Sequence, residues 1–80
     1  MRKPVIIYRN PLKPNIIYML RQNTQTNEWR IMVKSGQDRW RRVSGVPGNI
    51  HLFKAEETMA DFIYDHGLLE EQMDADLAGV

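Results

Sequence analysis

The chain has 80 residues, which predicts one domain with a single core, and its lack of cysteine excludes disulfides and thiolate metal sites. No apolar run reaches the roughly 18–20 residues of a membrane span. The apolar run at residues 5–8 is too short for a signal-peptide core of about 7–15 residues. We therefore expect a cytoplasmic protein with no membrane partner. The formal net charge of +1 conceals two oppositely charged parts, because residues 1–54 carry +9 and residues 55–80 carry −8.

The first half of the chain is expected to form strands. Residues 5–9 (VIIYR) and 16–22 (IIYMLRQ) are rich in β-branched and aromatic residues, and the prolines and asparagines between them favour a turn. Residues 28–34 (EWRIMVK) alternate as a half-buried strand does. Residues 39–43 (RWRRV) are expected to form a fourth strand, with Trp40 and Val43 on opposite faces.

A helix is expected over residues 55–66, preceded by a short strand at residues 50–53. Glu56 and Glu57 are expected in its first turn, and Gly67 is expected to end it in the left-handed conformation. One apolar stripe at helical spacing consists of Ala55, Met59, Phe62, Ile63 and His66, and Phe53 is expected to close the core with Met59, Phe62 and Ile63.

The acidic segment at residues 68–80 allows two interpretations. It forms either a short helix, with Leu69, Met73 and Leu77 at a spacing of four, or a frayed tail. The predicted fold is therefore α+β, in the order β-β-β-β-α. A three- to four-stranded antiparallel sheet packs against one C-terminal helix in a domain at residues 1–67, followed by the acidic segment.

The first two strands are apolar on both faces, and one helix cannot cover both. Either the C-terminal segment wraps round the sheet, or an apolar patch stays exposed for a partner protein or for a second copy of the chain in a homodimer. The candidate partner-binding residues in such a patch are Ile6, Tyr8, Ile17 and Met19.

Catalytic and metal-binding patterns are missing from the sequence. Ser35 and Ser44 lie in loops without a nucleophile motif, and His51 and His66 lack a recognised ligand spacing. Glu57, Asp61 and Asp65 would form one carboxylate stripe, which could hold a divalent ion or imitate phosphates but is more typical of a solvated helix face. We therefore expect a protein that is not an enzyme and has no cofactor and no metal site.

Basic and aromatic residues gather in the third and fourth strands. Nucleic-acid binders use guanidinium groups to neutralise phosphates, and often a planar ring that stacks on a base. The candidate residues for binding nucleic acid, duplex DNA in particular, are Arg30, Lys34, Arg39, Trp40, Arg41 and Arg42. The competing interpretation is that Trp29 and Trp40 are core residues and the arginines line a solvated face.

Residues 53–62 (FKAEETMADF) resemble the pattern F-x-[ST]-x-x-[EQ]-[AL]-x-x-[WF], which joins the last strand to the helix in several small sheet-plus-helix domains. Phe53, Met59 and Phe62 match this pattern, and Ala55 and Thr58 depart from it. One such group is the arm-DNA-binding domains of phage tyrosine recombinases. That resemblance implies a sheet that enters the major groove, with Arg30, Met32, Lys34, Arg39 and Arg41 near DNA.

The same pattern is similar to that of small stand-alone phage proteins, including some anti-CRISPR proteins, that block a host protein complex. The two resemblances imply different functions. The first is an accessory DNA-binding module of a mobile element, and the second is a phage-encoded inhibitor whose target is a protein.

Overall fold

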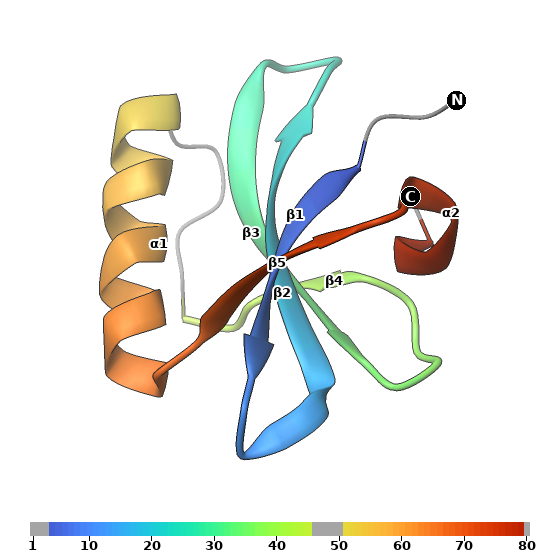
Figure 1. Cartoon of the computed structure of the whole chain (residues 1–80). Helices are drawn as coiled ribbons and strands as arrows, with labels where there is room; N and C mark the ends of the chain where they lie inside the picture. The colour runs from blue at the N-terminus through green and yellow to red at the C-terminus, as the bar shows by residue number, and fades with distance from the viewer. Residues whose placement is uncertain (1–3, 46–50, 80) are drawn as a thin grey trace.

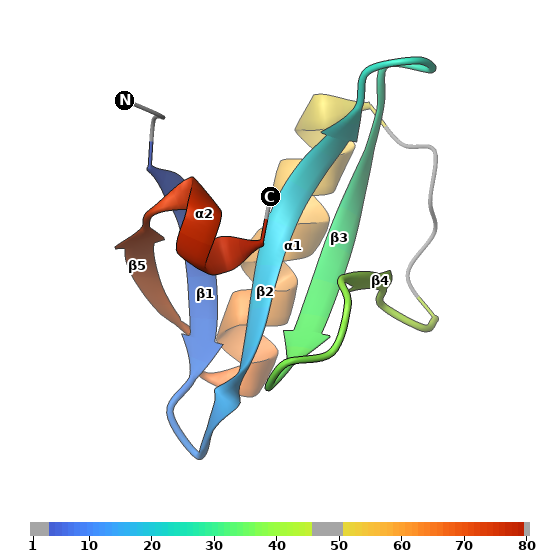
Figure 2. The ribbon, with the colours of Figure 1, turned by 90° about the vertical axis from the view of Figure 1, so that its right-hand side faces the viewer.

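The computed structural model describes residues 4–45 and 51–79. They form an antiparallel sheet with helices on its two faces (Figures 1 and 2). The elements in chain order are β1 (Val5–Asn10), β2 (Lys13–Asn23), β3 (Glu28–Ser35), β4 (Arg41–Arg42), α1 (Leu52–His66), β5 (Leu69–Met73) and α2 (Ala75–Ala78). The strand order is β4-β3-β2-β1-β5. The α+β class is confirmed. The described residues form a five-stranded sheet and two helices, where three to four strands and one helix were expected.

The hairpin of β2 and β3 forms the longest described ladder of the sheet. Its ladder runs without interruption from Asn23↔Glu28 to Ile16↔Ser35. The predicted alternation of β3 is confirmed, because Ile31 packs with Met59 of α1 while Met32 packs on the opposite face. β2 begins at Lys13, earlier than expected, and the register with β1 shifts at Asn10.

Each face of the sheet has its own hydrophobic cluster. On the α1 face, the buried residues Ile31, Met59 and Leu68 pack with Tyr8, Tyr18, Leu20, Val43, Phe62 and Ile63. On the opposite face, the buried residues Ile7, Ile17 and Met19 pack with Val5, Met32, Trp40 and Met73. Trp40 and Val43 therefore lie on opposite faces, as predicted.

The short helix α2 lies on the second face, where its residues Ala75 and Ala78 are buried. The C-terminal segment thus wraps round the sheet, which explains why β1 and β2 are apolar on both faces. Ile17 and Met19 were expected in an exposed patch, but they are only 7% and 5% exposed and belong to this core. Ile6 is 48% exposed, and Tyr8 is half-buried.

The helix α1 begins at Leu52, three residues before the expected start, so Glu56 and Glu57 lie beyond its first turn. Phe53 falls inside the helix and is 78% exposed, so the prediction that it closes the core is wrong. His51 precedes the helix, and residue 50 of the expected strand lies outside the described residues.

The rest of the helix follows the predicted stripe. Ala55 and Met59 are buried. His66 is exposed, and its ring centroid lies 4.2 Å from the ring centroid of Phe62. Gly67 ends the helix with φ 62°, the left-handed value that glycine adopts without steric cost, as predicted.

The segment after Gly67 is neither a helix from residue 69 to 77 nor a frayed tail. β5 pairs antiparallel with β1 from Val5↔Met73 to Arg9↔Leu69, and Leu68 before it is only 6% exposed. Arg9 Nε donates to Glu71 Oε2 at 2.5 Å and so links the two strands. Neither described helix is long and apolar enough to span a membrane.

Candidate nucleic-acid interface

The strand registers divide the predicted basic residues between the two faces of the sheet. Residues directly opposite each other on neighbouring strands share a face. Arg42 is opposite Met32, and Lys34 is opposite Ile17, so both lie on the α2 face with Arg30. Arg41 is opposite Val33 and lies on the α1 face. The six residues singled out in the sequence therefore do not form one surface.

Trp40 packs in the cluster of Ile7, Ile17 and Met19, and its indole N–H donates to the carbonyl oxygen of Ala78 at 2.6 Å. This contact favours the interpretation of Trp40 as a core residue over that of a stacking platform. Arg39, next to it, is exposed in the segment before β4.

The end of α2 also meets one of the predicted basic residues. A Cβ atom placed on Gly79 would come within 3.1 Å of the Lys34 ammonium nitrogen. The last turn of α2 therefore lies beside Lys34 and limits access to that part of the face.

Arg21 belongs to the basic face although the sequence analysis did not select it. It is exposed and is the direct cross-strand partner of Arg30. Two like charges at such a position destabilise a sheet by a few tenths of a kcal/mol to about 1 kcal/mol. Arg21 continues the alternation of Ile17 and Met19 along β2, and that spacing was the signal that could have identified it.

The guanidinium of Arg30 lies near the carboxylate of Glu28. The Arg30 side chain is 29% exposed, and its Nη2 lies 3.9 Å from Glu28 Oε2, at the long limit of an ion pair. Within the part of the chain that the structure describes, Arg21 makes no ion pair.

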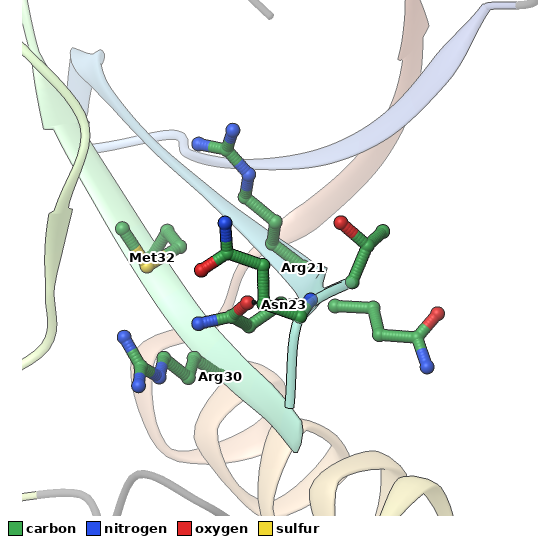
Figure 3. Close-up of a pocket in the computed structure, with 7 residues that line it drawn as sticks. Arg21, Asn23, Arg30 and Met32 are labelled. Atoms are coloured by element: carbon green, nitrogen blue, oxygen red, sulfur yellow. Dashed lines mark hydrogen bonds between the residues drawn. The ribbon is translucent and has the colours of Figure 1, made fainter. Parts of the chain in front are cut away.

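A pocket of about 330 Å³ opens at this end of the hairpin, lined by Arg21, Gln22, Asn23, Thr24, Gln25, Arg30 and Met32. Figure 3 shows Arg21 and Asn23 on β2 beside Arg30 and Met32 on β3. Among the described residues, the lining contains guanidinium, amide and hydroxyl groups, one thioether and no carboxylate. Such a site attracts anions and offers hydrogen-bond donors to them.

The turn that closes the pocket is held by Asn23. Its Oδ1 accepts the N–H of Gln25 at 3.0 Å, and its carbonyl oxygen accepts the N–H of Asn27 at 2.7 Å. Asn27 has φ 59°, a left-handed value that asparagine tolerates better than most residues. The polar loop predicted from composition is thus a tight turn that fixes the rim of the pocket.

The opposite side of the molecule is acidic. Glu56, Glu57, Asp61 and Asp65 are all exposed on α1, which covers the other face of the sheet. The charge asymmetry of the sequence becomes only a partial asymmetry between the two faces, because Glu71 lies opposite Ile7 on the α2 face and α2 itself carries Asp76. Among residues 4–45 and 51–79, no group of three or more His, Cys, Asp or Glu residues could hold a metal ion.

A second, apolar groove of about 690 Å³ lies between α1 and the strands β1 and β2. The described pairs between β1 and β2 involve residues 8–10 of β1. Toward its start, residues 5–7 of β1 pair with β5, and β2 diverges from β1 there (Figure 2). Ile6, 48% exposed, and Leu52, 41% exposed, line the groove.

Tyr8 also lines this groove, and acidic residues surround it. Its burial raises the pKa of the Tyr8 hydroxyl, and the carboxylates of Glu70 and Glu56 raise that pKa further. The groove therefore combines an apolar lining with a negative surrounding field.

Comparisons with known proteins add no relative: no family model, no curated protein and no solved structure matches this chain. The resemblance of residues 53–62 to phage domains thus stays a prediction from the sequence. The residues that it implied for DNA contact do not share one face, because Arg41 lies on the α1 face whereas Arg30 and Lys34 lie on the α2 face.

Proposed function

We propose that the protein is a small non-catalytic module that binds nucleic acid through the α2 face of the β2–β3 hairpin. The observation that carries this proposal is the opposition of Arg21 and Arg30 across the ladder. Their positive charges lie on neighbouring strands of one face, so a phosphate bound there would be attracted by both side chains.

Other basic residues extend this surface. Arg42 lies beside Met32 at the edge, and Lys34 lies further along β3. Arg9 shares the face, but its guanidinium is engaged by Glu71 and by the carbonyl oxygen of Pro14. Because the end of α2 limits access to Lys34, we expect contacts to about three phosphates, which would give a slope of about −3 in a plot of log affinity against log salt.

The position of α2 favours an end-on approach. Because α2 covers Ile7 and Ile17 and ends beside Lys34, the open part of this face is the hairpin end around Arg21, Arg30 and Arg42. This mode differs from the flat sheet in the major groove that the recombinase resemblance implies.

A matched pair of double variants tests the proposal by fluorescence anisotropy with labelled single-stranded and duplex oligonucleotides. The combination of Arg21→Ala and Arg42→Ala removes two charges from the proposed surface, and the combination of Arg41→Ala and Lys54→Ala removes two charges from the α1 side of the molecule. At ~50 mM salt we expect the first to weaken binding about 10- to 100-fold and the second to weaken it less than about 3-fold. Equal losses in both, or no binding to either nucleic acid, would refute the proposal.

A second candidate function is a phage-type inhibitor that blocks a host protein complex. The apolar groove beside Ile6 and Leu52 favours it, because exposed apolar patches mark protein contacts. Photo-crosslinking in host cells tests this function. One variant carries the crosslinking residue at position 6, and the control variant carries it at the exposed position 64. A defined partner linked from position 6 alone supports it. Links to a second copy of this chain would indicate a homodimer instead, and no link from position 6 would count against both.

A further inference from the structure

The apolar groove beside α1 runs along the edges of two strands. Val5 and Met19 pack in the cluster on the α2 face, and their chain neighbours Ile6 and Leu20 point to the α1 face. All four residues line the groove. A groove on one face of the sheet would be lined from that face alone. This groove therefore opens between β1 and β2, where the two strands diverge (Figure 2).

The divergence turns backbone groups of β2 toward the groove. Leu20 is opposite Ile31 in the ladder with β3, and the carbonyl oxygen of Ile31 accepts the N–H of Val43 on its far side at 3.1 Å. In an antiparallel ladder, two opposite residues either bond to each other or both direct their backbone groups away from each other. The N–H and C=O groups of Leu20 therefore point into the groove, and the described pairs between β1 and β2 do not include this residue.

Such an edge suits an extended peptide. A strand edge whose backbone groups are unpaired is a template for a further strand, and a peptide added there is held by its main chain while neighbouring pockets select its side chains. The groove volume of about 690 Å³ lies within the range of ligand sites, about 300–1,000 Å³. Met59 and Ile63 of α1 line it beside Leu20 and offer apolar contacts to such a peptide.

The charges around the groove favour a basic segment. Among the described residues that line it, Glu56 is the only charged one. Burial, and then the carboxylates of Glu70 and Glu56, raise the pKa of the Tyr8 hydroxyl, so both acids act on the groove. A Lys or Arg side chain of a bound segment would be attracted by these carboxylates, whereas an acidic side chain would be repelled.

The spacing on α1 narrows the sequence of the segment. Glu56 and Ala60 both line the groove and are one helical turn apart, which is about 5.4–6 Å along the helix axis. Alternate residues of a strand are about 6.6 Å apart and point to the same side. An extended segment along α1 can therefore place an apolar side chain beside Ala60 and Ile63 and, two residues away, a basic side chain beside Glu56.

We infer that this groove binds an extended segment of a partner protein that contains an apolar residue and, two positions away, Lys or Arg. The segment adds a strand at the edge of β2 and pairs its main chain with Leu20. The inference rests on the second candidate function, whose partner it assigns to a chemical class, and it is independent of nucleic-acid binding.

The test uses the full chain and a labelled octapeptide that repeats the order threonine, valine, threonine, lysine. In anisotropy titrations at ~50 mM salt, this peptide should bind about tenfold more tightly than the same peptide with glutamate in place of lysine. Equal affinities, or no binding of either peptide, would overturn the inference.

Two matched pairs of variants locate the bound peptide. Ile6→Lys places a positive charge in the groove, and Leu12→Lys makes the same change at a residue that is 88% exposed and is not part of the lining. We expect the first to lower peptide affinity about tenfold and the second less than about twofold. Glu56→Gln should lower it about two- to fivefold, and Glu57→Gln, next to it but outside the lining, should have less effect. Equal losses within both pairs would place the peptide elsewhere and overturn the inference.

Amide hydrogen exchange tests the backbone pairing and requires no substitution. The N–H groups of Met19 and Arg21 point toward β3, whereas that of Leu20 points into the groove. In the free protein the Leu20 amide should therefore exchange faster than its two neighbours, and the lysine peptide should slow its exchange about tenfold or more. An unchanged exchange rate of Leu20 in the presence of saturating peptide would overturn the inference.

The outcomes separate this inference from the function on which it rests. A defined protein crosslinked from position 6, together with no binding of either peptide, would retain the inhibitor function and overturn the proposed chemistry of its partner. Light scattering of the wild type and Ile6→Lys adds a further check. Self-association that Ile6→Lys abolishes would identify a second copy of the chain as the occupant, which also overturns the inference.

Discussion

The indole N–H of Trp40 donates to the carbonyl oxygen of Ala78 at 2.6 Å, and this bond joins segments from opposite edges of the sheet. Trp40 directly precedes the edge strand β4, whereas Ala78 belongs to α2, which follows the other edge strand β5. The bond fixes α2 across the face and so covers the cluster around Ile7 and Ile17. It also determines which part of the basic face stays open.

Replacing Trp40 by phenylalanine should lower the free energy of unfolding by about 1–2 kcal/mol. The variant loses the hydrogen bond to Ala78, worth about 1 kcal/mol, and part of the packing against the cluster. Urea denaturation measures the change. Leu77→Ala in α2 serves as the control, because Leu77 is 76% exposed and its truncation should lower the free energy of unfolding by less than about 0.5 kcal/mol. Equal stability of Trp40→Phe and the wild type would show that the bond does not hold α2 in solution.

Leu68 and Leu69 offer a test of whether the C-terminal segment is part of the core. Leu68 is 6% exposed and packs with Ile31 and Met59, whereas its neighbour Leu69 is 59% exposed. Leu68→Ala should therefore lower the free energy of unfolding by about 2–3 kcal/mol, and Leu69→Ala by less than about 1 kcal/mol. Denaturation curves of the two variants provide the comparison. A frayed tail would instead give small and similar losses for both.

The strand alternation and the helix end were predictable because local chemistry determines them. The residues of β3 alternate between apolar and polar, and Gly67 follows an apolar stripe at helical spacing. The start of α1 was misplaced because His51 precedes the helix without a side-chain cap, so no capping residue marks it.

The fifth strand could not be predicted from its own residues. The β5 sequence LEEQM contains acidic and amide residues with low strand propensity, and its leucine and methionine also fit a helical spacing. The pairing with β1 and the ion pair between Glu71 and Arg9 give it its conformation. The ion pair joins residues 62 positions apart in the chain, a separation at which local patterns carry no information.

The candidate site was predictable only in part for a similar reason. The arginines near β4 form a conspicuous run in the sequence, yet Arg41 and Arg42 alternate between faces once they are paired with β3. Arg21 was missed because it ends an apolar run, and its significance comes from the register that places it opposite Arg30. A basic surface is defined by cross-strand pairing and not by adjacency in the chain.

Glu28→Gln should raise the affinity for nucleic acid. The Glu28 carboxylate, 3.9 Å from Arg30 Nη2, competes with a bound phosphate for this guanidinium, so its neutralisation should strengthen binding about two- to fivefold at ~50 mM salt. The control Glu57→Gln makes the same charge change on α1, where Glu57 pairs with Lys54 at 3.1 Å. Anisotropy titrations with the same oligonucleotide compare the two. Equal gains in both would attribute the effect to net charge and not to the Arg21–Arg30 pair.

The titration of Tyr8 should make the fold sensitive to alkaline pH. Burial, and then the carboxylates of Glu70 and Glu56, raise the pKa of Tyr8 above its ordinary value of 10.0. The folded state thus retains a proton that the unfolded chain releases. The contribution of this group to stability is complete below pH 10, and it is lost as the pH rises through the raised folded value.

We therefore expect the free energy of unfolding of the wild type to fall above pH 10, with a slope below the single-proton limit of about 1.4 kcal/mol per pH unit because Tyr8 is only half-buried. Tyr8→Phe, which cannot ionise, should show a shallower decline in urea denaturation between pH 9 and pH 11. Tyr64→Phe, at a position that is 88% exposed, should retain the wild-type profile. Parallel profiles for Tyr8→Phe and the wild type would mean that the hydroxyl of Tyr8 is solvated in the folded protein, and that the groove between α1 and β1 is open to water at this residue.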